Sequence, residues 1–230
     1  MYESGACDYQ PDVICYDALI NAFGWSAVRG KGREAYKIYR KMLHLFETGS
    51  NRSAKPDIIT CNSVLNACAY DTADTPLERA ELIDIVVTTF EDFQANQAKF
   101  GRLNHVTYAT VLIAISKHME PSEQRSDLAE ATFWQCAKAG HVSVLVIMQL
   151  HNALPWERCK KILGSALLSG EGENLRFIFN DLPKEWTRHA PSVKQRTGSR
   201  ASKKYLSSVP VTKVALAKEK LALAKENKCG

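Results

Sequence analysis

A segment near the start of the chain recurs twice further along, and this repetition constrains the fold more than any other feature of the sequence. Residues 11–22 (PDVICYDALINA) match residues 56–67 (PDIITCNSVLNA), which begin 45 positions later. A third copy, 104–114 (NHVTYATVLIA), is offset by a further 47 positions. Self-similarity on this scale is typical of proteins that stack several copies of one structural unit. We therefore expect a repeat architecture whose function depends on an extended surface and not on an enclosed pocket.

Each copy has the hydrophobic pattern of two helices separated by a polar break. In the first half of each copy, apolar residues recur at intervals of three and four, the spacing of one buried face of a helix. The residues expected on this face are Ile14, Leu19, Ile20 and Phe23, then Ile59, Val64, Leu65 and Cys68, then Val106, Val111, Leu112 and Ile115. Polar segments follow at 29–32, 71–76 and 120–123, and a second helical pattern comes after each. The sequence therefore predicts an all-α chain of helix–turn–helix units, with a degenerate fourth unit that begins at His141.

Two further features indicate where the first helix of each unit starts and how it packs. Asp12 and Asp57 each follow a proline just before a predicted helix. An aspartate at that place accepts hydrogen bonds from the free amides of the first turn. Ala22, Ala67 and Ala114 occupy matching positions, where a small side chain lets two helices approach closely.

The repeated segments resemble the pentatricopeptide repeat family. A unit of that family opens with the pattern Val-x-x-Tyr-Asn-x-Leu-Ile, to which residues 13–20 (VICYDALI) are similar. Residues 34–42 (EAYKIYRKM) resemble the second helix of such a unit. The resemblance implies a right-handed α-solenoid over 11–168. We expect a C-terminal cap or anchor segment at 169–190 and a basic tail at 191–230.

The first two units are longer than those of the family, and the extra residues fall at 43–55 and 95–103. Insertions in repeat proteins usually form loops, so we expect these residues to connect one unit to the next. Beyond the repeats, we expect Trp186 to anchor the C-terminal segment by packing on the last helix pair.

The resemblance also implies which residues would read RNA. Pentatricopeptide proteins bind single-stranded RNA along their first helices, and two or three side chains read one base per repeat. The residue after the family's tyrosine acts together with the last residue of the same unit. The base-reading residues implied for this chain are Asp17 with Asp57, Asn62 with Asn104, and Ala109 with Gly140 or His141.

These three pairs differ in their chemistry. Asn62 has two donors and an acceptor on its carboxamide, so it can match the Watson–Crick edge of a base. The resemblance implies that the Asn62–Asn104 pair prefers a pyrimidine, cytosine foremost. Asp17 and Asp57 are acceptors only when ionised, which favours donor groups on the base or a bridging water. Ala109 offers no side-chain hydrogen bond, so the third unit should read a base weakly or not at all.

Other residues match the family's contacts to base faces and to phosphates. The residues that match its aliphatic base clamps are Ile14, Ile59 and Val106. Ordinary packing between stacked units is the alternative for these three. Lys117 lies where the family places a lysine on the phosphate backbone, and the matching residues of the first two units are Trp25 and Tyr70. An aromatic ring cannot neutralise a phosphate. It can stack on a base, but packing in the core is the favoured interpretation for these two rings.

The sequence carries no motif for catalysis, for a cofactor or for a metal. It has no glycine-rich phosphate loop, no deaminase His-x-Glu with Cys-x-x-Cys, and no metalloprotease motif. Asp71, Asp74 and Glu78 flank a helix start, where carboxylates are favourable, so we interpret them as helix-start residues and not as a metal site. The cysteines expected to be small buried hydrophobic residues are Cys15, Cys61, Cys68, Cys136 and Cys159. No apolar run reaches the roughly 18 residues of a membrane-spanning helix, so no membrane attachment is expected.

Positive charge is concentrated in the tail. Residues 191–230 contain ten basic and two acidic residues, whereas the whole chain has a net charge of +5, so residues 1–190 sum to −3. A basic segment of this kind is typical of nucleic-acid binding, and the alternative is a solvated segment that only keeps the protein soluble. We expect residues 196–208 to be disordered and residues 211–228 to be helical.

The function expected from these patterns is the binding of single-stranded RNA without catalysis. By resemblance, the protein would act in RNA processing, stability or translation in a mitochondrion or plastid, with other RNA-processing proteins as further candidate partners. The first ten residues contain two acids and no arginine, unlike a transit peptide. The alternative function is a helical protein–protein interaction scaffold of the tetratricopeptide type, which the negative charge of the repeats favours.

Overall fold

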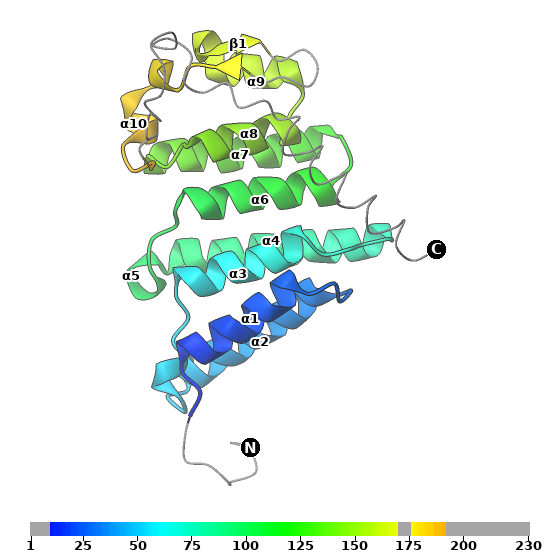
Figure 1. The fold of residues 1–230 in the computed structure, drawn as a ribbon, viewed down its shortest axis with the longest axis vertical. Coiled ribbons are helices and arrows are strands. Elements are labelled where there is room, and N and C mark those ends of the chain that lie inside the picture. The colour runs from blue at the N-terminus through cyan, green and yellow to red at the C-terminus, as the bar shows by residue number, and fades with distance from the viewer. Residues whose placement is uncertain (1–9, 170–175, 192–230) are drawn as a thin grey trace, which may run out of the picture.

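The computed structural model describes residues 10–169 and 176–191, and this part of the chain is predominantly α-helical (Figure 1). The helices are α1 (Val13–Trp25), α2 (Lys31–Glu47), α3 (Ile58–Ala69), α4 (Pro76–Ala95), α5 (Gln97–Phe100), α6 (His105–His118), α7 (Glu123–Ala139), α8 (Val144–Ala153), α9 (Trp156–Leu163) and α10 (Lys184–Thr187). The all-α prediction is confirmed at this level. None of the described helices is long and apolar enough to cross a membrane. The predicted disordered and helical parts of the tail lie outside the described residues.

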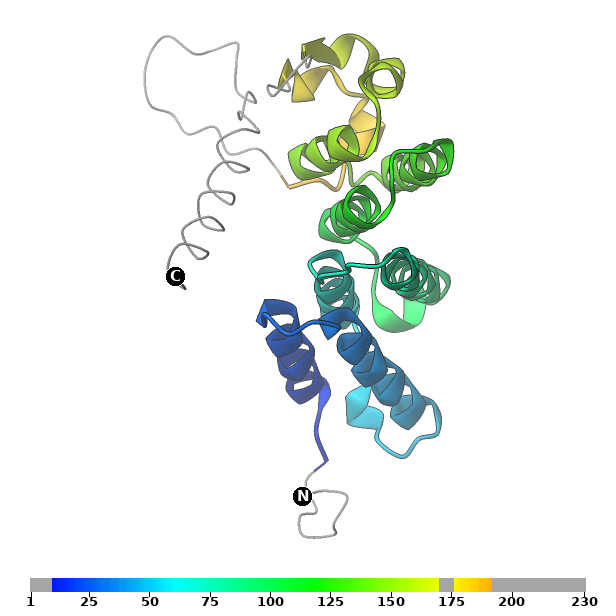
Figure 2. The same cartoon turned by 90° about the vertical axis from the view of Figure 1, so that its right-hand side faces the viewer.

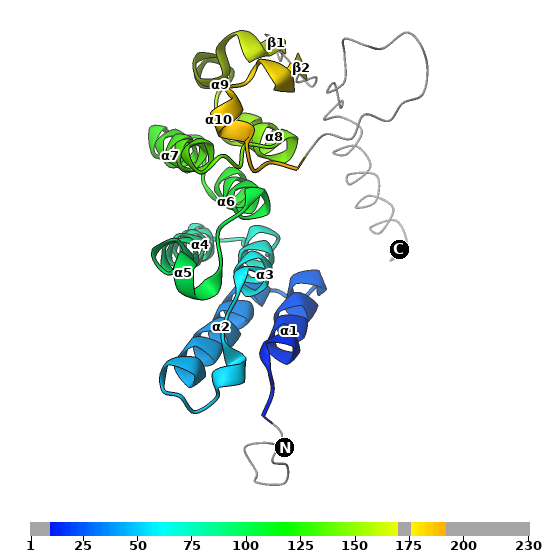
Figure 3. The same ribbon diagram turned by 90° about the vertical axis from the view of Figure 1, so that its left-hand side faces the viewer.

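The long helices form hairpins that lie in two rows. Helix α1 is connected by a short loop to α2, α3 to α4, and α6 to α7, and each of these pairs is in contact. The helices α1, α3, α6 and α8 follow one another along one side, while α2, α4 and α7 lie along the other (Figure 3). Each helix of the first row therefore contacts the next one in that row, and residues at matching positions of α1, α3 and α6 recur along a common side.

The first helices start at the residues that the alignment of the three copies places in register. They begin at Val13, Ile58 and His105. The predicted caps are also confirmed, because Asp12 accepts a hydrogen bond from the backbone of the first turn of α1 and Asp57 does the same for α3. In the fourth unit, which is predicted to begin at His141, the first helix is α8. Helix α8 begins at Val144 and is capped by Ser143.

The core follows the predicted apolar stripe except at two places. The predicted residues that are buried are Ile20, Val64, Leu65, Cys68, Val111, Leu112 and Ile115. The second residue of each first helix is exposed instead, which places Ile14, Ile59 and Val106 on the surface. Leu19 is exposed as well, because no described helix covers that side of α1.

The cysteines also divide between core and surface. Cys15 is exposed, so the prediction that it is a buried hydrophobic residue is wrong. It shares the uncovered side of α1 with Leu19. The buried cysteines are Cys61, Cys68, Cys136 and Cys159. Burial raises the pKa of the Cys61 thiol far above its ordinary value, which keeps this group protonated and unreactive.

The two insertions are largely helical and pack on each other, whereas the sequence predicted loops. Helix α2 continues to Glu47, and the second insertion contains α5. The ring of Phe46 lies 6.3 Å from that of Phe100, measured between centroids. Lys99 places its Nζ 5.0 Å and 4.8 Å from the centroids of these two rings and pairs with Glu47 at 3.6 Å. The first insertion is also tied to the start of the chain, since Nδ2 of Asn51 donates to the carbonyl of Pro11 at 2.7 Å.

The C-terminal segment departs from the prediction in two ways. Two short strands, β1 (Leu167–Ser169) and β2 (Arg176–Phe177), pair antiparallel where only helices and an anchor segment were expected. Trp186 packs against Phe133 and Trp134 of α7, which is one helix pair earlier than predicted. The backbone N–H of Val142 donates to the carbonyl of Trp186 at 2.8 Å. The segment therefore closes over α7 and the start of α8.

Candidate nucleic-acid interface

Asp17 and Asn62 occupy the same position in α1 and α3 and make the same contact with the next helix of the row. The hydroxyl of Thr60 donates to Oδ1 of Asp17 at 2.7 Å, and the hydroxyl of Thr107 donates to Oδ1 of Asn62 at 2.8 Å. Both threonines are the third residue of their helix. Each predicted base-reading side chain is therefore held by a hydrogen bond across the junction between two helix pairs.

The two remaining polar atoms, Oδ2 of Asp17 and Nδ2 of Asn62, form no hydrogen bond within the described residues. Asn62 is half-buried and Asp17 is buried, with 8% of its surface exposed. Burial raises the pKa of Asp17 to about 6, an effect that the Thr60 hydrogen bond opposes and the nearby charge of Asp57 reinforces. Asp17 is thus a carboxylate at neutral pH that gains a proton under mildly acidic conditions.

Asp57 and Asn104, the predicted partners in base reading, are helix caps. Oδ1 of Asp57 accepts from the backbone of Ile59 at 2.7 Å and from that of Thr60 at 3.2 Å. Asn104 caps α6 in the same way, and both caps form reciprocal capping boxes with the threonine three residues later. The same threonine thus contacts both members of a predicted pair, so the structure brings Asp17 close to Asp57 and Asn62 close to Asn104.

Sequence reasoning missed Thr60 and Thr107. The signal was present, because Asp57 and Asn104 are each followed three positions later by a threonine. A hydroxyl-bearing residue three positions after a cap is one form of the reciprocal capping pattern. The further bond from each threonine to the preceding helix is a tertiary contact, which no local pattern predicts.

The third unit lacks this polar arrangement. Ala109 is completely buried, and the residue that matches Thr60 and Thr107 in the next helix is Val146, which is also buried. Ser143 caps that helix by accepting from the backbone of Val146 at 3.3 Å. Gly140, one of the expected partners of Ala109, instead ends α7 in a left-handed conformation with φ of 78°. The junction between α6 and α8 is therefore apolar at the position where the first two junctions are polar.

An aliphatic side chain is exposed at the second position of each helix in the first row. Ile14 is 72% exposed and Ile59 is 56% exposed, and Val106 is exposed to a lesser extent. Leu145 in α8, which the sequence reading did not include, is exposed at the same position. These side chains are not buried between units, so the packing alternative does not describe them. They form a row of apolar groups, one per helix pair.

Lys117 lies beside an aromatic residue of the preceding unit. Its Nζ lies 3.9 Å from the centroid of the Tyr70 ring, a cation–π contact between α6 and the end of α3. Trp25, at the matching position of the first unit, is 86% exposed. The expectation of core packing is therefore wrong for Trp25. Matching residues at the C-terminal ends of α1, α3 and α6 are Trp25, Tyr70 and Lys117. The exposed aliphatic residues lie at the N-terminal ends of the same helices.

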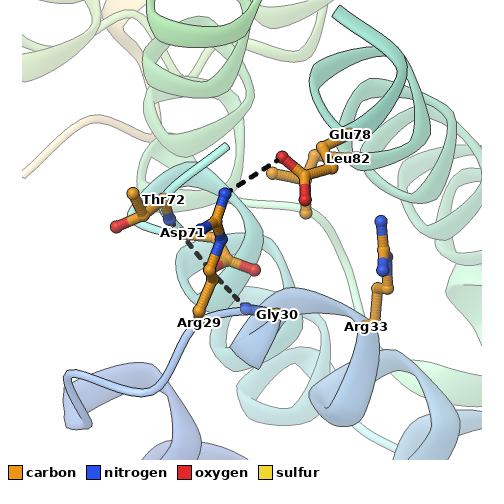
Figure 4. A pocket seen from close by; sticks show the side chains of 7 residues that line it. All are labelled: Arg29, Gly30, Arg33, Asp71, Thr72, Glu78 and Leu82. Carbon is orange, nitrogen blue, oxygen red and sulfur yellow. Dashed lines mark hydrogen bonds and ion pairs between the residues drawn. The ribbon is translucent and has the colours of Figure 1, made fainter. Parts of the chain in front are cut away.

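A surface pocket lies between the α1–α2 loop and the α3–α4 loop (Figure 4). Most of its polar groups are engaged with one another, and Arg33 pairs with Glu81 outside the pocket at 2.6 Å. Asp71 accepts from the backbone N–H groups of Gly30 at 3.1 Å and Gly32 at 2.9 Å, so a residue of the second unit caps α2 of the first. Arg29 pairs with Glu78 at 3.5 Å. The pocket is a junction between units. Glu78 has the expected helix-start role, since it accepts from the backbone of Thr75 in the capping box of α4, whereas Asp71 caps α2 and not the helix that it precedes.

Glycine is required at two places in this junction. Gly30 precedes α2 with φ of 76°, a left-handed conformation that other residues adopt only with strain. Gly32 lies so close to α3 that an added Cβ would approach the Cα of Cys68 to 3.0 Å and a methyl group of Leu82 to 2.8 Å. The loop therefore permits α2 to pack directly against the second unit.

No group of three or more His, Cys, Asp or Glu residues in the described ranges is arranged to hold a metal ion. No protein-family model, curated protein or solved structure matches this chain.

Proposed function

We propose that the row formed by α1, α3, α6 and α8 binds single-stranded RNA, and that the helix pairs form a right-handed solenoid of the pentatricopeptide type. The observation that carries this proposal is a recurrence along the row. In each of the first two units, an exposed aliphatic residue lies three positions before a polar one. These pairs are Ile14 with Asp17 and Ile59 with Asn62. Exposed apolar side chains beside hydrogen-bonding groups suit a ligand that has flat apolar faces and polar edges, as unstacked bases have.

The hydrogen bond to Asn62 supports a specific role for its carboxamide. Because Oδ1 accepts from Thr107, the polar group of this side chain with no partner among the described residues is the Nδ2 amide, which is a donor. Acceptors on a pyrimidine edge, such as O2 and N3 of cytosine, suit such a donor. Asp17 has the opposite character and offers an acceptor, so the first two units would favour different bases. We assign the weakest reading to the third unit, because Ala109 is buried and has no polar group.

Electrostatic attraction to phosphates would come from few groups. Lys117 is the residue of the row that we assign to the RNA backbone. Its ammonium group lies over the ring of Tyr70, the residue that matches Lys117 in the second unit. The basic tail at 191–230, whose structure lies mainly outside the described residues, would supply the larger share of the charge. By family resemblance, we place this activity in RNA processing, stability or translation in a mitochondrion or plastid, where bound RNA is protected by steric exclusion.

Equilibrium binding to short single-stranded RNAs, with DNA of the same sequence as a control, tests the proposal. The informative variant is Ile59→Ser in the full chain, since this side chain is mostly exposed and its loss should leave the fold intact. We expect affinity to fall, by less than the roughly 1–3 kcal/mol that removal of an aromatic stacking side chain costs, because an aliphatic side chain offers a smaller contact to a base. Leu77→Ser, which changes an exposed leucine on α4, is the matched control. Equal loss in the two variants, or no RNA binding by the unaltered chain, would contradict the proposal.

A protein–protein scaffold is the second candidate function. Two observations favour it: residues 1–190 sum to −3, and exposed apolar side chains can also bind a peptide or a helix. A scaffold would retain its partner at high salt, whereas RNA binding weakens steeply as salt rises. RNA binding that persists unchanged in Asn62 and Ile59 variants but is lost with the tail would favour the scaffold role for the helices.

A further inference from the structure

The last described part of the chain is fastened to the repeats at one place, the end of α7 and the loop that follows it (138–142). The backbone N–H of His189 donates to the carbonyl of Gly140 at 2.8 Å. The backbone N–H of Val142 donates to the carbonyl of Trp186, also at 2.8 Å. Helix α10, which lies in the orange part of Figure 2, packs on α7 at the same place. The attachment therefore crosses a single short loop.

The side chain of Arg188 adds to this attachment. Its Nη2 donates to the carbonyl of Lys138 at 3.2 Å. It also lies directly against Gly140, where an added Cβ would approach Cγ of Arg188 to 2.5 Å. We call residues 184–190, which these contacts hold, the strap. The preceding segment is held elsewhere, since β2 pairs with β1.

His141 lies in the middle of the contact between the strap and the loop. Its ring is 5.4 Å from that of His189 and 6.4 Å from that of Tyr108, measured between centroids. Nδ1 of His141 is shielded from solvent and has no hydrogen-bond partner among the described residues. A proton on this nitrogen would be a buried donor without an acceptor, which is costly. The closed strap therefore accommodates the neutral ring of His141 and disfavours the imidazolium.

The charges around His141 act in the same direction as burial. The charged groups that act most strongly on it are basic: His189 and Arg188 from the strap, and His105 from α6. Tyr108 of α6 is uncharged, because burial raises its pKa to about 12. Burial first, and then these charges, lower the pKa of His141 below its ordinary value of 6.5, and the backbone of His189 offsets this only in part.

We infer that the strap is a pH switch, which is closed over α7 when His141 is neutral and opens when His141 takes up a proton. In the open form both ring nitrogens reach water, and the imidazolium is separated from Arg188 and His189. The open form therefore binds the proton more readily than the closed form. Closure is favoured at neutral pH and is lost progressively as pH falls below about 6.5. The switch does not depend on RNA and goes beyond the proposed function.

Opening of the strap would change one small area of the surface. In the closed form, the ring of Trp186 lies 5.6 Å from that of Phe133 and 5.4 Å from that of Trp134, between centroids. Phe133 is completely buried. Departure of the strap uncovers these two rings of α7, while the contacts among the long helices stay in place. The change is therefore local, which distinguishes it from acid unfolding.

Hydrogen exchange of the full chain without RNA, at about pH 7.5 and about pH 5.5, tests this inference after correction for intrinsic exchange rates. We expect the amides of Val142 and His189 to exchange up to about tenfold faster at the lower pH. That is the factor by which an imidazole of ordinary pKa, one unit above the lower pH, favours the open form. The amides in the middle of α3, in the second unit, should change less.

His141→Gln removes the titrating group and should keep both amides protected at the lower pH. His44→Gln, at an exposed histidine of α2, is the matched control and should behave like the unaltered protein. His189→Gln, at an exposed position of the strap, removes one neighbouring charge and should reduce the acid response without abolishing it. Circular dichroism checks the folding of each variant, and the result for His189→Gln decides if His141→Gln loses helical content.

Three outcomes would overturn the inference. They are equal exchange of the two amides at both pH values, an acid response that the substitution of His141 leaves unchanged, and an equally large response in α3. Because RNA is absent from every sample, failure of the switch is distinguishable from failure of the proposed function.

Discussion

The hydroxyl of Thr107 donates to Oδ1 of Asn62 over 2.8 Å and so joins the start of α6 to the middle of α3. The acceptor is the residue that we assign to base reading, and the donor belongs to the capping box of the next helix. Under the proposed function, base recognition and the contact between helix pairs would therefore share one carboxamide. A substitution at Asn62 alters both, and the two effects have to be separated by the choice of variants.

Asn62→Ala is expected to weaken RNA binding by about 1–3 kcal/mol for the preferred base and by less for the others. It should also lower the free energy of unfolding by about 1 kcal/mol, because Thr107 loses its acceptor on α3 and keeps only the 3.3 Å contact with Oδ1 of Asn104. Thr107→Val is the control, since it breaks the same hydrogen bond but leaves the carboxamide in place. Binding to RNAs that differ at one base separates the effects. Equal losses for all bases would argue against a reading role.

Asp17→Asn is expected to stabilise the protein at neutral pH by on the order of 1 kcal/mol, after allowance for solvent access to the site. The pKa of Asp17 is about 6 in the folded chain, above its ordinary value of 3.8. The folded state therefore binds a proton more tightly, and the cost of the buried charge is present above pH 6. As pH falls from 6 toward 3.8, that cost disappears and the two proteins should converge in stability.

Chemical denaturation at several pH values measures this difference. Asn62→Asp is the matched variant, because it places a carboxylate beside Thr107 in the same way that Asp17 lies beside Thr60. It should destabilise the protein most at neutral pH and least in acid. A constant offset between Asp17→Asn and the unaltered protein across this range would show that the carboxylate is not the cause.

His118 should destabilise the folded protein as pH falls, which is opposite to the effect expected for Asp17. Its ring lies buried with Nε2 2.9 Å from the carbonyl of Cys68, to which the N–H donates. Burial lowers the pKa of His118 below its ordinary value of 6.5. The unfolded state therefore binds the proton more readily, and stability is lost as pH falls below about 6.5. His118→Gln keeps a donor and should flatten this part of the stability profile, which thermal unfolding can follow, with His44→Gln as the exposed control.

Asp71→Ala is expected to destabilise the protein by about 1 kcal/mol, the usual cost of a lost N-terminal cap. The carboxylate accepts from Gly30 and Gly32, where α2 has no side-chain cap of its own. Asp74→Ala removes an exposed ion pair with Arg29 and should cost less, because such pairs contribute little. Urea unfolding distinguishes the two. Equal effects would mean that the charge near Arg29 matters more than the cap.

Local patterns predicted the helices well because those helices are repeated and strongly capped. The offset between copies placed the starts of α3 and α6 correctly, and Asp57 is both the predicted and the observed cap. The buried residues followed helical spacing at Val64 and Leu65. The second residue of each first helix was wrongly placed in the buried stripe, since helical spacing alone does not tell which apolar residue lies at the edge of the stripe. Ile59 fits a buried stripe in the sequence and is mostly exposed in the structure.

Features that depend on contacts between units could not be predicted from local sequence patterns. The bonds from Thr60 to Asp17 and from Asp71 to the start of α2 join residues about forty positions apart in the chain. The exposure of Leu19 depends on its being in the first unit, where no preceding pair is described. The strand pair at the C-terminal end rests on segments too short to show an alternating pattern.

The contact between Phe46 and Phe100, with Lys99 over both rings, has a consequence for exchanging parts of this protein. Neither insertion is a spacer, because each supplies the surface that the other one covers. Replacing the first unit with a shorter one would remove Phe46 and Glu47 from Phe100 and Lys99, and shortening the second would remove Phe100 and Lys99 from Phe46. The first two units should therefore be transferred to another repeat protein together. The third unit can be replaced without disturbing the contact between Phe46, Lys99 and Phe100.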